Sequence, residues 1–191
     1  CWDNFEYFKL TPKGKELKPQ IPLPVRLFGV RLEKIVEAQG KNHDDIAQKE
    51  IARLRKQVKL LPKNSVVILD AQNDLQRLDD DGFWNKLTTD KIEFLDGVIK
   101  PLLRTVSDTD YKSMRFEKDI VEVSLAHLQD DKDKFETLSY TIVEEIGELP
   151  LTINTVAKEQ ELIRKAQSNH FWATASEEKF DMLIERIAPL M

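Results

Sequence analysis

Residues 83–103 read FWNKLTTDKIEFLDGVIKPLL, and residues 171–191 read FWATASEEKFDMLIERIAPLM. Both stretches open on the doublet Phe-Trp and have Pro-Leu near their ends, and their apolar positions stay in phase throughout. The stretches begin 88 residues apart, and the Leu-Pro dipeptides that precede them share this offset. Several coincidences at one offset indicate an internal repeat, with copies at residues 61–103 and 149–191.

Each copy has the signals of a helix that ends, a turn and a second helix. Leu-Pro ends a helix, because proline lacks an amide donor and disfavours the α conformation of the residue before it. The Phe-Trp doublet then forms a bulky apolar plug. We expect four structural anchors: Phe83, Trp84, Phe171 and Trp172. Thr88 and Ser176 are expected to supply N-cap oxygens to the following helix, and two such copies predict a helical bundle with pseudo-two-fold character.

The rest of the chain from residue 25 onward has helical periodicity. Apolar residues recur at steps of four and three from Ala47 to Leu61, which is typical of a helix that packs on another helix. The first apolar face is formed by Leu27, Leu32, Ile35 and Val36. No stretch beyond residue 25 alternates at period two for long enough to form a strand, although residues 65–69 come closest. We therefore expect an all-α fold, a helical bundle built around the repeat.

The first 24 residues differ from the rest of the chain. Residues 1–11 read CWDNFEYFKLT and hold four aromatic residues: Trp2, Phe5, Tyr7 and Phe8. So short a segment cannot bury its own rings, and we expect them to pack on the rest of the chain or on a neighbour. Residues 12–24 hold four of the eight prolines, which is typical of an extended strap. The expected domains are an aromatic segment with its linker at 1–24 and an all-helical domain at 25–191.

The composition is that of an ordinary globular protein. The 191 residues are 41% hydrophobic and 33% charged, with a net charge of −5. This acidic balance argues against a surface that is basic all over and wraps nucleic acid. A single cysteine and the lack of a long apolar run favour a cytoplasmic protein without membrane contacts. The chain opens on Cys1 rather than on methionine, which indicates a piece of a longer protein.

The sequence predicts no catalytic, cofactor-binding or metal-ligating residue. His43, His127 and His170 are isolated, without Cys, His or carboxylate partners at ligand spacing. The EEK triplet at residues 177–179 has the Glu-x-Lys order of part of a nuclease site, but it fits a charged first turn of a helix better. No phosphate-binding loop of the Gly-x-x-x-x-Gly-Lys type is present.

A basic stripe is the polar feature with the clearest ligand class. Its residues are Lys49, Arg53, Lys56 and Lys59. Such a stripe on one helix is suited to contact phosphates or a partner protein. The alternative is an ordinary solvated helix face.

Several segments of the chain resemble one protein family. They are CWDNFEYF (1–8), LPVRLFGVRLEKI (23–35), KSMRFEKDIVEVSLAHL (112–128) and the two Phe-Trp…Pro-Leu stretches. Together they resemble the C-terminal region of the R subunits of type I restriction enzymes, over nearly the whole chain. In that family a nuclease site and a helicase-like ATPase motor precede this region. The resemblance therefore implies that the parent protein binds ATP and Mg²⁺. It also implies that the catalytic motifs of the family lie outside this chain.

The resemblance also implies a function and partners. The expected function is a non-catalytic assembly domain of an ATP-dependent, DNA-translocating endonuclease. It would dock to the modification and specificity subunits and reach DNA through the complex. Two alternatives stay open: a helical domain of the same motor that contacts DNA phosphates through the basic stripe, and a helical scaffold of an unrelated ATPase.

Overall fold

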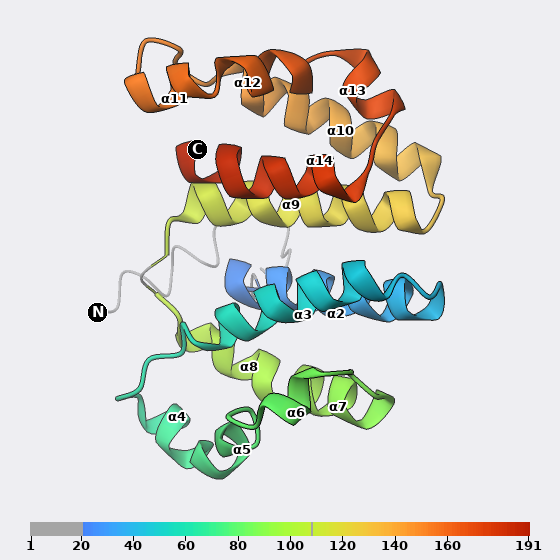
Figure 1. Cartoon of the computed structure of the whole chain (residues 1–191). Coiled ribbons are helices and arrows are strands. Elements are labelled where there is room, and N and C mark those ends of the chain that lie inside the picture. The colour runs from blue at the N-terminus through green and yellow to red at the C-terminus, as the bar shows by residue number, and fades with distance from the viewer. Residues whose placement is uncertain (1–20, 108) are drawn as a thin grey trace, which may run out of the picture.

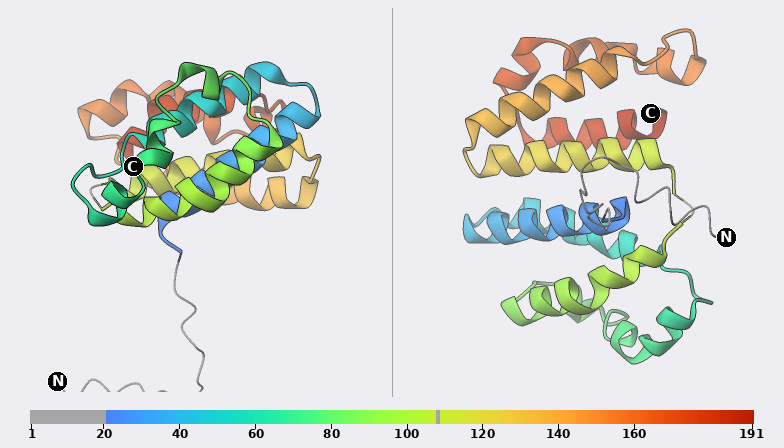
Figure 2. Two further views of the ribbon diagram at one scale, coloured as in Figure 1. Left: turned by 90° about the horizontal axis from the view of Figure 1, so that it is seen from below. Right: turned by 180° about the vertical axis from the view of Figure 1, so that it is seen from behind.

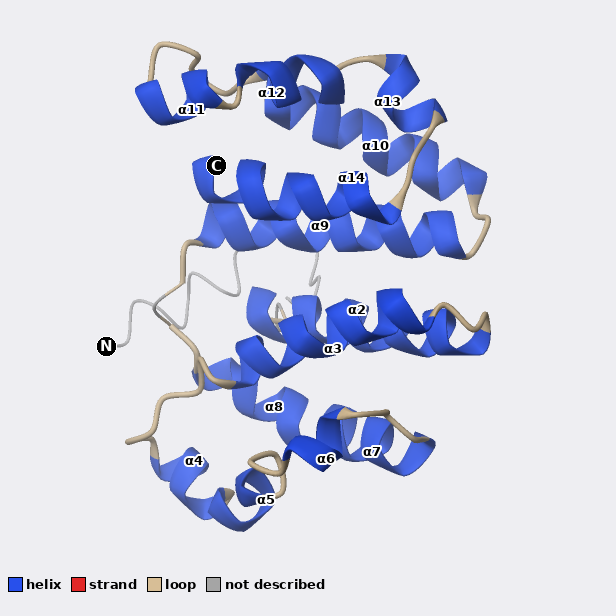
Figure 3. Ribbon diagram, in the orientation of Figure 1, coloured by secondary structure: helices blue, strands red, loops and turns tan. Residues whose placement is uncertain are grey.

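The computed structural model describes residues 21–107 and 109–191, and it confirms the all-α prediction for this part of the chain. Every regular element in the described residues is a helix (Figure 3). The expected aromatic segment and most of its linker lie at residues 1–20, outside the described residues. None of the described helices combines the length and the hydropathy that a membrane span requires.

The first half of the described chain, residues 21–107, has two long helices followed by short ones. The long helices are α2 (Leu23–Gly40) and α3 (Asp44–Val58). The short elements are α4 (Val66–Asp70), α5 (Gln72–Gln76), α6 (Asp81–Trp84), α7 (Thr89–Phe94), η1 (Leu95–Ile99), α8 (Lys100–Leu102) and η2 (Leu103–Thr105). In Figure 1 the short helices lie below α2 and α3.

The second half, residues 109–191, has the same order of elements 88 residues later. Its long helices are α9 (Tyr111–Leu128) and α10 (Lys132–Gly147). Its short elements are α11 (Asn154–Lys158), α12 (Gln160–Ala166), α13 (Asn169–Ala173), α14 (Glu177–Met182), η3 (Leu183–Ile187) and η4 (Ala188–Leu190). The structural correspondence begins with α2, well before residue 61, where the sequence repeat starts. That the two halves arose by duplication stays a prediction.

The long helices α2 and α9 end in the same way. Asn42 and Asp130, at equivalent positions, have left-handed backbone with φ of 59° and 58°. The amide of the next residue bonds back to Ala38 in one half and to Ala126 in the other, at 2.8 and 3.0 Å. This is the pattern of a Schellman cap, which satisfies the last carbonyls of a helix. Asn and Asp tolerate the left-handed conformation better than most residues.

Each half also ends in a helix with a π-helical turn before a proline. In η1 the Lys100 amide bonds to the Leu95 carbonyl, and in η3 the Ala188 amide bonds to the Leu183 carbonyl, five residues back in each case. Proline has no amide to donate, and its ring clashes with the carbonyl four residues earlier in an ordinary α-helix. The wider turn leaves room for the ring, so the helix continues past the proline.

The two halves pack head to tail, and the predicted pseudo-two-fold arrangement is therefore wrong. Helices α2 and α9 lie side by side at the centre of the molecule, as Figure 1 and Figure 2 show. On one side α3 faces α14, to which it is joined by an ion pair between Lys49 and Asp181. A two-fold axis would also bring their counterparts α10 and α7 together, but these lie far apart, towards opposite ends of the molecule (Figure 1). Different faces of equivalent helices thus meet at the centre.

Each half has its own hydrophobic core. One core gathers side chains from α2, α3 and the short helices of the first half. The other gathers side chains from the second half and gains Leu23 and Leu27 from α2. The prediction that Val36 lies on the buried face of the first helix is wrong, because this side chain is 47% exposed. The faces of α2 that pack on α3 and α9 do not include it.

Two local predictions at helix starts are also corrected. Thr88 and Ser176 occupy the N-cap positions of α7 and α14, but neither side chain bonds to its helix. Lys91 and Lys179 tie these helices to carbonyls of the preceding Phe-Trp turn instead, at 2.6 and 2.9 Å. Pro24, assigned to the linker, lies in the first turn of α2, where a proline needs no amide partner.

Candidate functional site: the charged junction between the halves

The densest group of charged side chains lies where the two halves meet. We call it the junction cluster: Arg31, Lys34, Glu50, Arg53, Glu177 and Asp181. Arg31 and Lys34 lie three residues apart on α2, and Glu50 and Arg53 lie three residues apart on α3. Glu177 and Asp181 lie four residues apart on α14. Residues at these spacings share one face of a helix. Three helices therefore present charge towards one region.

Lys34 is the centre of the cluster and is completely buried. Its Nζ lies 3.1 Å from Glu50 Oε1 and 2.8 Å from Glu177 Oε2. The hydroxyl of Ser124 on α9 donates a hydrogen bond to the other carboxylate oxygen of Glu177. Removing one partner from a buried ion pair leaves an uncompensated charge, which is strongly destabilising. The cluster therefore fixes how α14 lies against α2 and α3.

Arg31 extends the contacts of the cluster to α9. Its guanidinium donates to Gln57 Oε1 at 3.1 Å and to the carboxylate of Glu117 on α9. Gln57 in turn donates to the carbonyl of Pro24 at 2.6 Å. One connected set of hydrogen bonds thus joins the start of α2, the end of α3 and the neighbouring half.

Two of the four residues of the predicted basic stripe belong to this junction. Lys49 Nζ lies 2.7 Å from Asp181 Oδ2, and Arg53 lies 2.9 Å from Glu50 and 2.8 Å from Asp181. Lys56 and Lys59 are exposed at the far end of α3. The four side chains therefore do not form one free stripe. Lys49 and Arg53 neutralise carboxylates of the other half.

The cations of the junction keep its carboxylates charged. Burial by itself would raise the pKa of Glu50, but Lys34, Arg31 and Arg53 outweigh burial and hold this pKa below its ordinary value of 4.5. Burial would likewise raise the pKa of Asp181, and the hydrogen bonds and charges of Lys49 and Arg53 hold it below 3.8. Both carboxylates are therefore ionised at neutral pH.

The junction is suited to cohesion rather than to chemistry. Lys34 and Glu50 are buried and paired with charged side chains of the cluster, so neither side chain is open to a substrate from solvent. Across residues 21–107 and 109–191, no group of three or more His, Cys, Asp or Glu side chains could hold a metal ion. His127 lies between the rings of Phe135 and Phe180, with centroid distances of 5.5 and 6.0 Å.

The four anchor residues are buried and make equivalent contacts in the two halves. Trp84 Nε1 donates to the carbonyl of Leu78 at 2.9 Å, and Trp172 Nε1 donates to the carbonyl of Ala166 at 2.7 Å. In both doublets the phenylalanine and tryptophan rings meet edge to face, with centroids 5.2 and 5.4 Å apart. The doublets are structural, and each fixes a short helix against its core.

Sequence reasoning missed an exposed apolar surface on α4. Val66, Val67 and Leu69 are 71%, 51% and 49% exposed, and we call these three residues the α4 patch. Ile68, between them, points into the core. The signal was available at the offset of 88, because residues 154–157 read NTVA where residues 66–69 read VVIL. The positions that define the repeat carry similar residues in both copies, whereas at the positions of the α4 patch the first copy has large apolar residues and the second has smaller or polar ones.

Comparison with known proteins does not assign a family or a fold relative. No family model, no curated protein and no solved structure matches the chain. The described residues therefore define a class by their own features: an all-helical protein of two similar halves, packed head to tail and joined by buried ion pairs.

Proposed function

We propose that the chain is a non-catalytic assembly domain of the R subunit of a type I restriction-modification enzyme. In this role it docks an ATP-dependent, DNA-translocating nuclease polypeptide to the modification and specificity subunits. The resemblance of residues 1–8, 23–35 and 112–128 to R subunits supports the choice of family. The observation that supports a docking role is the α4 patch.

The α4 patch has the properties of a docking surface. Three apolar side chains are exposed next to one another on one short helix. Contiguous apolar surface of this kind on a folded protein marks interaction sites. Fully burying one valine or leucine side chain is favourable by about 1.5–3 kcal/mol, so a partner that covers the patch gains substantial free energy.

The second half indicates that the fold itself does not need the patch. The outer face of α11, at the equivalent positions, carries Asn154, Thr155 and Ala157, all exposed. The inward residue is apolar in both halves, as Ile68 and Val156. The unit therefore forms with a polar outer face on this helix, and the apolar face of α4 is available for a contact outside the fold.

The test replaces the α4 patch with the residues of the second half. The variant Val66→Asn, Val67→Thr, Leu69→Ala should weaken binding to the purified modification–specificity complex by at least about tenfold, equivalent to about 1.4 kcal/mol. Isothermal titration calorimetry measures the dissociation constant, and urea denaturation should show a free energy of unfolding that is not reduced. The matched control Val36→Thr, Val98→Thr removes exposed apolar groups elsewhere and should bind like the wild type.

Two results would count against the proposal. Equal affinity of the wild type and the α4 variant would exclude the patch from the interface, and failure of the wild-type chain to bind would contradict the docking role. A parallel titration with duplex DNA addresses the phosphate-contacting alternative. Affinity that falls steeply with salt and is lost on replacing Lys56 and Lys59 would favour that alternative.

A further inference from the structure

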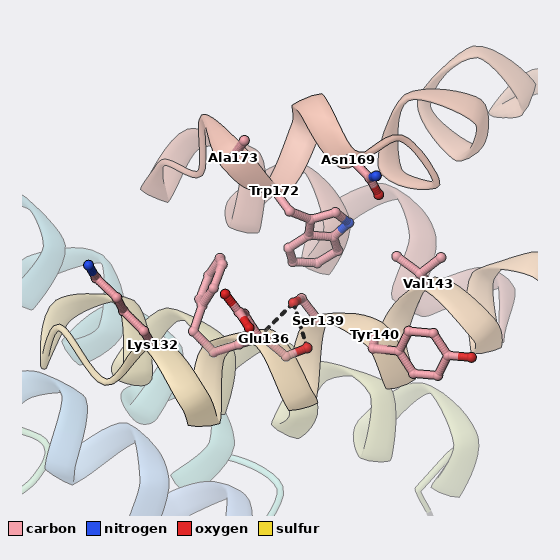
Figure 4. Close-up of a pocket in the computed structure, with 9 residues that line it drawn as sticks. Lys132, Glu136, Ser139, Tyr140, Val143, Asn169, Trp172 and Ala173 are labelled. Atoms are coloured by element: carbon pink, nitrogen blue, oxygen red, sulfur yellow. Dashed lines mark hydrogen bonds between the residues drawn. The ribbon is translucent and has the colours of Figure 1, made fainter.

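A groove between α10 and α13 exposes apolar surface in the second half. It has a volume of about 620 Å³, and Phe135, Tyr140, Val143, Trp172 and Ala173 are among the residues that line it. In Figure 4 Trp172 points from α13 towards α10, and Tyr140 lies at one end. The Phe135 and Trp172 rings meet edge to face with centroids 6.3 Å apart. Phe135, Tyr140 and Trp172 thus give the groove aromatic surface, beside the polar side chains of Lys132, Glu136, Ser139 and Asn169.

The equivalent groove of the first half is closed by polar bridges. There Arg55 on α3 pairs with Asp81 on α6. The side-chain amide of Gln48 donates to the carbonyl of Asn85 at 2.6 Å. These two bridges span the gap between α3 and α6 at both ends.

The second half has lost the groups that make both bridges. Val143 and Asn169 occupy the positions equivalent to Arg55 and Asp81, and the position of the donor Gln48 is occupied by Glu136, whose carboxylate cannot donate to a carbonyl. None of the replacements restores an ion pair. Since the two halves otherwise share their elements, this groove is open because of its side chains and not because of its fold.

We propose that the aromatic segment at residues 2–8 of the same chain docks in the α10–α13 groove. The segment carries Trp2, Phe5, Tyr7 and Phe8, a set of rings too large to bury within eight residues. It is joined to α2, which begins at Leu23, by residues 9–22, and fourteen residues span up to about 49 Å when extended. A compact body of about 170 residues has a radius of gyration near 15 Å, so the linker reaches the groove from the start of α2.

The occupant is matched to the groove by chemistry. Apolar rings gain most from a site whose walls are aromatic, because aromatic pairs add edge-to-face attraction to the burial of apolar surface. Docking within the chain also loses less entropy than capture of a separate molecule, since the linker keeps the segment near the groove. This docking concerns the chain alone and does not depend on the partner subunits proposed above.

Cys1 makes the test direct, because it is the single cysteine of the chain and adjoins the segment. A nitroxide spin label on Cys1 of the full chain should broaden amide resonances of residues 132–143 and 169–173. Those residues should lose most of their intensity, whereas residues 66–70 should keep theirs. Absence of broadening at the groove, or its appearance only elsewhere, would overturn the proposal.

Two control variants show whether the groove itself holds the segment. The variant Val143→Arg, Asn169→Asp installs the bridge that closes the first-half groove, and it should abolish the broadening. The matched variant Val36→Arg, on another exposed surface, should leave the broadening unchanged. Spin-labelled chains mixed with isotope-labelled, unmodified chains should show no effect. Broadening confined to that mixture would place the segment on a neighbouring copy and overturn docking within the chain.

Discussion

The indole rings of Trp84 and Trp172 are buried, and each ring N–H donates a hydrogen bond to the backbone carbonyl of the residue six positions earlier. A buried donor or acceptor without a partner costs about 1–3 kcal/mol, so this hydrogen bond determines which way the ring turns. The ring in turn holds α6, or α13, against the segment before it. The Phe-Trp doublet was visible in the sequence as an apolar plug, but the carbonyl that orients it was not.

Replacing either tryptophan by phenylalanine tests this equivalence. Trp84→Phe and Trp172→Phe should each lower the free energy of unfolding by about 1–3 kcal/mol, because each leaves a buried carbonyl unpaired and a small cavity. Urea denaturation measures the change. The control Tyr111→Phe, at an exposed position, should stay within about 0.5 kcal/mol of the wild type. A wild-type result for one tryptophan variant and not the other would contradict equivalent roles.

At the scale of elements, the helices could be predicted because their apolar residues recur with the helical period. The period from Ala47 to Leu61 predicted the helix now seen as α3. The period does not say which neighbour covers a face, and Val36 was therefore misplaced. The π-helical turns before Pro101 and Pro189 could not be predicted either, because proline normally signals the end of a helix and not a wider turn.

The left-handed residue at the end of α2 gives a prediction at this scale. Asn42→Ala should lower the free energy of unfolding by about 1 kcal/mol, because alanine resists the φ of 59° that the Schellman cap requires. Asn42→Gly should not destabilise the chain, since glycine adopts this conformation freely. Chemical denaturation of both variants beside Gln39→Ala, which lies within the helix, provides the measurement. Equal losses for alanine and glycine would show that the backbone conformation is not the cause.

At the scale of the whole molecule, the contact between the two halves explains what Lys49 and Arg53 of the basic stripe bind, namely Asp181 of the other half. Lys49 and Asp181 are 132 residues apart in sequence, and no local pattern connects them. Sequence reasoning identified Lys49 and Arg53 as candidate contact residues without seeing that their carboxylate partners lie in the same chain. The head-to-tail packing that brings α3 to α14 supplies those partners.

Acid should weaken this junction. The pKa of Glu50 and that of Asp181 are held below their ordinary values of 4.5 and 3.8. A carboxylate with a depressed pKa in the folded state contributes stability that is complete above its unfolded pKa and is lost as the pH falls through its folded pKa. The free energy of unfolding should therefore fall as the pH drops from about 4.5 towards 3. Asp181→Asn should flatten this dependence in a pH series of urea denaturations, and stability that rises with acid would contradict the prediction.

The docking role is tested most directly by hydrogen–deuterium exchange of the chain with and without the modification–specificity complex. Amides at residues 66–76, in α4 and α5, should exchange more slowly in the complex because the partner covers the α4 patch. Residues 111–128 of α9, which lie inside the molecule, should be unchanged. Protection of residues 44–58 by duplex DNA, with no change at residues 66–76 when the protein subunits are added, would contradict a docking role for this domain.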